Sequence, residues 1–68
     1  MKVKYFDDTD TALLELTPNE VVETREINPN TYFDLDAEGE LVSITIEHAR
    51  QRALMPEVIV ERFGKGVA

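Results

Sequence analysis

The chain has 68 residues, no cysteine, and 14 acidic against 7 basic residues, for a net charge of −7. This length allows one small domain, the missing cysteines exclude disulfides, and the acidic excess argues against direct nucleic-acid binding. The start reaches Asp7 and Asp8 without the apolar core of a signal peptide, and no apolar run could span a membrane. We therefore expect a small cytoplasmic protein.

The first half of the chain predicts three strands. Apolar and polar residues alternate over residues 2–5 and 11–16, which predicts a hairpin around the acidic turn at 7–10. Thr17-Pro18-Asn19 ends this hairpin, because proline cannot donate to the strand ladder. Residues 20–27 form the third predicted strand, and their many charges are typical of a sheet edge.

The second half predicts another hairpin. Strands over 32–36 and 40–46 follow the break at Asn28-Pro29-Asn30. Gly39 between them suits a type I turn with a G1 bulge, since glycine tolerates positive φ. The alternation predicts one apolar face that contains Phe33, Leu35, Val42, Ile44 and Ile46.

Helix-forming residues replace the alternation at 47–54, which predicts a short helix. Residues 56–63 favour a second helix with Ile59, Val60 and Phe63 on one face, although the β-branched run at 58–60 also suits a strand. The predicted fold is therefore α+β: a five-stranded, mainly antiparallel meander with one or two short C-terminal helices packed on one face. We expect a single domain over 1–63 and a flexible tail over 64–68.

The order of several short segments resembles a small prokaryotic family named domain of unknown function 2283. The matching segments, between about residues 3 and 50, are Tyr5-Phe6-Asp7, Asp10, Ala12-Leu13, Val22–Glu26, Asp34–Val42, Ile44, Ile46 and Glu47-His48-Ala49. Phe6 separates a Tyr and an Asp that the family usually joins, and Ser43 stands where it often has glycine. The resemblance implies an antiparallel sheet with a helix and no assigned reaction. Because members are sometimes encoded beside small toxin-like proteins, it also implies an antitoxin-like role.

The acidic hairpin is a candidate calcium loop. Asp34, Asp36, Glu38 and Gly39 match positions 1, 3, 5 and 6 of such a loop, but Thr45 stands where a bidentate glutamate is needed. The flanking segments also read as strands rather than helices. We therefore interpret this segment as a hairpin turn rather than a metal site.

The other polar residues predict no catalytic or metal centre. The second acidic turn, Asp7-Asp8-Thr9-Asp10, could join the first in a weak cation site only if the two turns converge, and local backbone capping is the simpler explanation. His48 is the only histidine, and Ser43 is expected on the opposite face of the strand, so no nucleophile–base pair is predicted.

Apolar side chains on the second face of the sheet predict a protein interface: Phe6, Leu13, Tyr32 and Leu41. Residues 1–47 carry a net charge of −9, and residues 48–68, with Arg50, Arg52, Arg62 and Lys65, carry +2. We therefore expect a non-enzymatic, homodimeric interaction module without cofactor, which can also pair with a basic protein partner. The alternative is a weak divalent-cation or small-ligand binder that uses the acidic turns.

Overall fold

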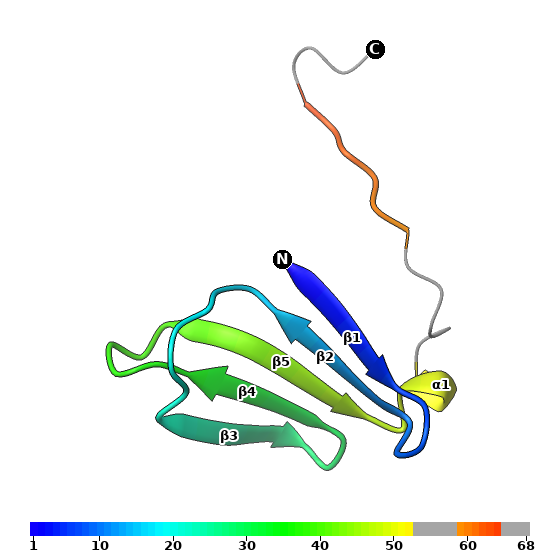
Figure 1. Cartoon of the computed structure of the whole chain (residues 1–68), viewed down its shortest axis with the longest axis horizontal. Coiled ribbons are helices and arrows are strands. Elements are labelled where there is room, and N and C mark those ends of the chain that lie inside the picture. The colour runs from blue at the N-terminus through cyan, green and yellow to red at the C-terminus, as the bar shows by residue number, and fades with distance from the viewer. Residues whose placement is uncertain (53–58, 65–68) are drawn as a thin grey trace.

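The computed structural model describes residues 1–52 and 59–64. Five strands form a single layer of antiparallel sheet (Figure 1): β1 (Lys2–Phe6), β2 (Thr11–Glu15), β3 (Glu23–Asn28), β4 (Thr31–Leu35) and β5 (Leu41–Glu47). One helix of four residues, α1 (Ala49–Arg52), follows β5. The described part of the chain is therefore mostly β, and the prediction of an α+β class is corrected accordingly.

The strand order is β1-β2-β5-β4-β3, so the predicted simple meander is wrong at one step. β3, β4 and β5 follow one another as a meander, but β2 pairs with β5 instead of β3. β5 is the longest strand and is rich in β-branched residues, which suit a central position. The charged strand β3 is at one edge, as predicted, and the lysine-bearing strand β1 is at the other.

The segment between β2 and β3 crosses the end of the sheet. The backbone amides of Leu16 and Thr17 donate to the Val42 carbonyl at 2.8 and 3.3 Å, and the Val22 amide donates to the Leu35 carbonyl at 2.9 Å. These bonds fix the segment across β5 and β4. The break at Thr17-Pro18-Asn19 is therefore the start of a long connection rather than a tight turn.

The hairpin between β4 and β5 has the predicted geometry. The Gly39 amide donates to the Asp36 carbonyl at 3.0 Å, the Asp36 amide donates to the Glu40 carbonyl at 2.9 Å, and Gly39 has a φ of +80°. This is the pattern expected of a type I turn followed by a G1 bulge. A second irregularity between Asp34 and Leu35 leaves Leu41 opposite Leu35.

The C-terminal prediction is only partly correct. A helix was expected over 47–54, but Glu47 belongs to β5 and the helix covers only Ala49–Arg52, with residues 53–58 outside the described part. Residues 59–63 form no helix, and Ile59, Val60 and Phe63 expose 76%, 74% and 88% of their surface. The proposed helical face of these three residues is therefore wrong, because β-branched residues favour extended backbone when no tertiary contact opposes it.

We predict that Gly39→Ala destabilises the fold by about 1 kcal/mol, because an alanine at positive φ is strained. The space around the missing Cβ is open, so the cost comes from the backbone alone. Gly39→Asn is the matched control and should cost less, since asparagine tolerates this conformation. Urea unfolding checks both; an alanine variant as stable as the wild type would contradict the assigned turn.

Candidate functional site

One face of the sheet is apolar. Cross-strand partners share a face, and one row across all five strands contains Val3, Leu14, Ile44, Phe33 and Arg25. The next row contains Tyr5, Ala12, Ile46 and Thr31. We define the apolar face by Val3, Tyr5, Ala12, Leu14, Phe33, Leu35, Val42, Ile44 and Ile46.

The apolar face is only partly covered. Ala12, Leu35 and Val42 expose 0%, 8% and 4% of their surface, whereas the other members of the face are half-buried. Within residues 1–52 and 59–64, no large side chain is fully buried. The guanidinium carbon of Arg50 is 5.8 Å from the centre of the Tyr5 ring and shields part of it by a cation–π contact. The rest of the face is a candidate binding surface.

The opposite face is polar. Its two central rows are Lys4, Leu13, Thr45, Tyr32 and Glu26, and Lys2, Glu15, Ser43, Asp34 and Thr24. Phe6, Leu13 and Tyr32 lie on this face as predicted, but Thr45 separates Leu13 from Tyr32, and the bulge places Leu41 opposite Leu35. The apolar surface predicted here is therefore interrupted, and the continuous apolar surface is on the other side.

A buried carboxylate organises the polar face. Asp34 exposes only 9% of its surface, and three hydroxyl groups from neighbouring strands donate to it. Thr24 Oγ1 donates to Oδ1 at 2.9 Å, while Ser43 Oγ and Thr45 Oγ1 donate to Oδ2 at 2.7 and 3.1 Å. Because β3, β4 and β5 each contribute one member or more, this network joins three strands. It satisfies the buried charge with donors rather than with a cation.

The carboxylate of Asp36 holds the acidic turn together. Its Oδ1 accepts the backbone amides of Glu38 and Glu40 at 3.0 and 2.9 Å, and its Oδ2 accepts Asn19 Nδ2 at 3.0 Å. The bond from the Glu40 amide, followed by that from Asn19, lowers the pKa of Asp36. Asp34 and Asp36, the first two acids of the calcium-loop spacing, thus accept hydrogen bonds from the protein itself. Within the described residues, no three His, Asp or Glu side chains gather as a metal site.

The other acidic turn anchors the start of α1. Asp10 has a positive φ of 54°; its carbonyl accepts the Ala49 amide at 2.9 Å, and its Oδ1 accepts the Arg50 amide at 2.9 Å and the Tyr5 hydroxyl at 2.6 Å. The bond from Tyr5 is the main cause of a lowered pKa at Asp10. This turn adjoins the Glu47 end of β5, whereas the Asp36 turn adjoins the Leu41 end. The two acidic turns are therefore far apart and do not converge on one cation.

His48 lies at the junction of β5 and α1. It has a positive φ of 56°, its carbonyl accepts the Gln51 amide at 3.1 Å, and its Nδ1 is 2.8 Å from Asn30 Oδ1. It therefore abuts the start of α1. Ser43 donates its hydroxyl to Asp34 instead of approaching this histidine, so the structure brings together no serine–histidine pair.

The basic residues near the C-terminus do not form a cluster among the described side chains. Arg50 Nη2 is 3.8 Å from Asp7 Oδ1, and both side chains are exposed, so this pair contributes little. Arg62 is exposed on the C-terminal segment. The side chain of Arg52 and the whole of Lys65 lie outside the described part.

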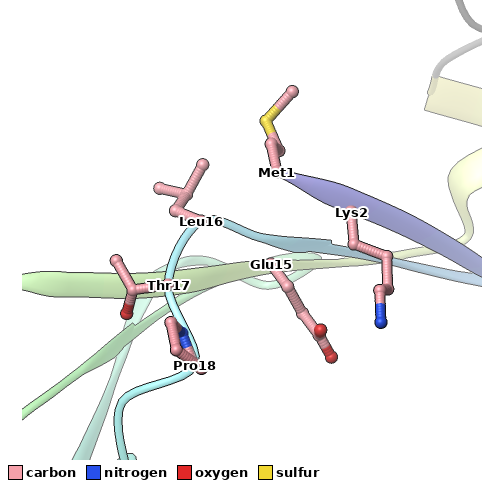
Figure 2. Close-up of a pocket in the computed structure, with 6 residues that line it drawn as sticks. All are labelled: Met1, Lys2, Glu15, Leu16, Thr17 and Pro18. Carbon is pink, nitrogen blue, oxygen red and sulfur yellow. The ribbon is translucent and has the colours of Figure 1, made fainter.

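Shallow hollows surround the connection between β2 and β3. One of about 250 Å³ is lined by Met1, Lys2, Glu15, Leu16, Thr17 and Pro18. Figure 2 shows Met1 and Leu16 on one side of the ribbon and Lys2 and Glu15 on the other, so their side chains do not converge on one point. A second hollow lies between the connection and Leu13, Glu15, Val42 and Ser43 at this end of the sheet. These open hollows lack a convergent set of polar groups that would fix a ligand.

These features define a small, single-sheet β protein with one apolar and one polar face. The chain belongs to the family described as Protein of unknown function (DUF2283), whose profile matches residues 2–50, and this confirms the resemblance seen in the sequence. Searches of curated proteins and of solved structures returned no match. Within the described residues, no helix is long and apolar enough to cross a membrane.

Sequence reasoning missed the Asp34 network and the attachment of α1 to Asp10. A signal for the network was present, because alternation already placed Ser43 and Thr45 together on the face opposite Ile44. The pairing of β4 with β5 then brings Asp34 opposite Ser43. No comparable signal existed for Asp10, whose contact with Arg50 joins residues forty positions apart.

We predict that Asp34→Ala destabilises the fold by about 1–3 kcal/mol, because it leaves three hydroxyl groups without their shared acceptor. Asp34→Asn is the control and should lose less stability, since asparagine has a similar shape and keeps one oxygen acceptor. The free energy of unfolding in urea measures both effects. Equal stability of the alanine variant and the wild type would show that the network does not hold the strands together.

We also predict that stability falls in acid. The pKa values of Asp10 and Asp36 are lowered from the ordinary value of 3.8, so their contribution is present above that value and is lost as the pH falls through the lowered pKa. Asp36→Asn should reduce the dependence of the urea midpoint on pH in this range, because an amide does not titrate there. Ala37→Ser, an uncharged change in the same turn, should keep the wild-type slope. If Asp36→Asn also kept the wild-type slope, Asp36 would not contribute to the pH dependence of stability.

Proposed function

We propose that this protein is a non-enzymatic protein–protein interaction module that forms a homodimer through its apolar face. The supporting observation is the continuous row Val3, Leu14, Ile44 and Phe33, whose side chains remain half-buried in the single chain. Contiguous apolar patches of this kind mark interaction sites. Two such sheets can pack face to face, about 10 Å apart, and exclude water from both rows.

The distribution of charge favours a second copy as the partner. The strands present only Glu23 and Arg25 as charged residues on the apolar face, and these two form an ion pair of 2.7 Å. The face is therefore formally neutral although the whole chain carries −7. Contact through this face keeps most of the acidic side chains of two copies away from one another, which lowers their mutual repulsion.

In such a dimer the polar faces point outward. Each presents two lysines, Lys2 and Lys4, against four acids: Glu15, Glu26, Asp34 and Glu47. This acidic surplus suits a basic protein as a further partner, which is what an antitoxin-like role requires. Asp34 is buried, so the carboxylates available to such a partner are those of Glu26, which is exposed, and of Glu15 and Glu47, which are half-buried.

Leu13 and Leu14 provide a matched test of the interface, because they are neighbours on β2 that lie on opposite faces. We predict that Leu14→Gln weakens dimerisation about tenfold or more, since burying a leucine contributes roughly 1.5–3 kcal/mol. Leu13→Gln should leave the dissociation constant unchanged. Sedimentation equilibrium measures the dimer dissociation constant of each variant, and circular dichroism checks that both variants are folded.

If Leu13→Gln weakened dimerisation and Leu14→Gln did not, the interface would lie on the polar face instead. If Leu14→Gln fails to fold, Val3→Gln on the edge strand β1 tests the same face with less effect on the sheet centre. A wild-type chain that stays monomeric at hundreds of micromolar, a range in which weak dimers form, would contradict the homodimer.

A further inference from the structure

The edge of β1 is available for pairing with another strand. β1 bonds to β2 on one side only, so its outer backbone groups have no partner within the sheet. The opposite edge is less suitable, because β3 carries Glu23, Arg25 and Glu26 and has a bulge between Glu26 and Asn28. β1 has no such irregularity, and its Phe6 exposes 46% of its surface.

The segment Ile59–Phe63 has the composition of a strand without a partner. Ile59, Val60 and Phe63 are among the most exposed large apolar residues in the described part of the chain. Figure 1 shows this segment, in orange, running clear of the sheet. Its β-branched and aromatic residues favour strand structure when a neighbouring strand is present.

Three of the five side chains of the segment complement those of β1 in one antiparallel register, which also places Arg62 opposite Val3 and Phe63 opposite Lys2. With Ile59 opposite Phe6, two exposed apolar side chains meet, and Glu61 is opposite Lys4. The same register places Val60 opposite Tyr5. A shift by one residue would set Glu61 against Val3 or Tyr5, with no charge to pair with. Cross-strand pairs of opposite charge and of apolar side chains are the contacts that select a register.

We infer that Ile59–Phe63 of one copy adds to the edge of β1 in a second copy as a sixth antiparallel strand. This inference rests on the homodimer proposed above and specifies how it is completed. The segment runs away from its own sheet, so a second copy can receive it without rearrangement of the segment. By two-fold symmetry each copy donates one segment and receives one, which closes the dimer.

The size of the apolar face shows what this addition would contribute to a dimer. Five strands of about five residues cover roughly 400 Å² of flat area, from spacings of about 4.8 Å between strands and 3.3 Å along them. Stable interfaces bury about 800 Å² from each partner. Strand addition contributes main-chain hydrogen bonds and further apolar contact on both copies.

Disulfide cross-linking tests the pairing cleanly, because the chain has no cysteine of its own. Lys4→Cys and Glu61→Cys are made in separate full-length chains that carry tags of different mass, and the two are mixed and oxidised. We expect a heterodimer of Lys4→Cys with Glu61→Cys, since paired residues lie within disulfide range. Glu26→Cys mixed with Glu61→Cys is the matched control, because Glu26 is an exposed residue on the opposite edge strand. It should give at least tenfold less heterodimer.

The results separate this inference from the proposed function. Equal yields from Lys4→Cys and Glu26→Cys, while light scattering still reports a dimer of the unmodified chain, would overturn the strand addition and leave the apolar-face dimer intact. A chain with both Lys4→Cys and Glu61→Cys that cross-links only within itself would also overturn it, in favour of pairing with its own sheet. A monomeric unmodified chain would overturn both proposals.

Discussion

The structure depends on the pairing of β5 with both of its neighbours. β5 joins the hairpin of β1 and β2 to the hairpin of β3 and β4, so without it the chain would be two isolated ribbons, which are marginally stable in water. The two faces of β5 make different contacts. Ile44 and Ile46 continue the apolar rows, while Ser43 and Thr45 bind the carboxylate of Asp34 on the adjacent strand.

The single-layer architecture also leaves most side chains of the apolar face half-buried. A single layer has two faces, and the described part of the chain satisfies one of them with hydrogen bonds and ion pairs, such as that of Lys4 with Glu15 at 2.9 Å. On the other face, the contact that α1 makes within the described residues is that of Arg50 with Tyr5. The proposed self-association would cover the remaining apolar side chains.

Local patterns predicted local structure well, and long-range pairing poorly. The alternation in β5 and the positive φ at Gly39 were readable because each depends on a few neighbouring residues. The strand order could not be predicted from the sequence. Thr17-Pro18-Asn19 signals a break, but it does not show whether the chain turns back or crosses the sheet. The apolar surface predicted around Leu13 and Tyr32 is interrupted by Thr45, because alternation within one strand does not show which residue of the neighbouring strand lies between them. The second predicted helix is absent from residues 59–63, where composition alone suggested it.

The central claim is that two copies meet through the apolar face, and isotope-filtered NOE spectroscopy on a mixture of labelled and unlabelled chains tests it most directly. This measurement detects only contacts between copies. The account predicts intermolecular NOEs from the methyl groups of Leu14 and Ile44, which lie side by side on the apolar face. Intermolecular NOEs from Leu13 without any from Leu14 or Ile44, or none at millimolar concentration, would contradict it.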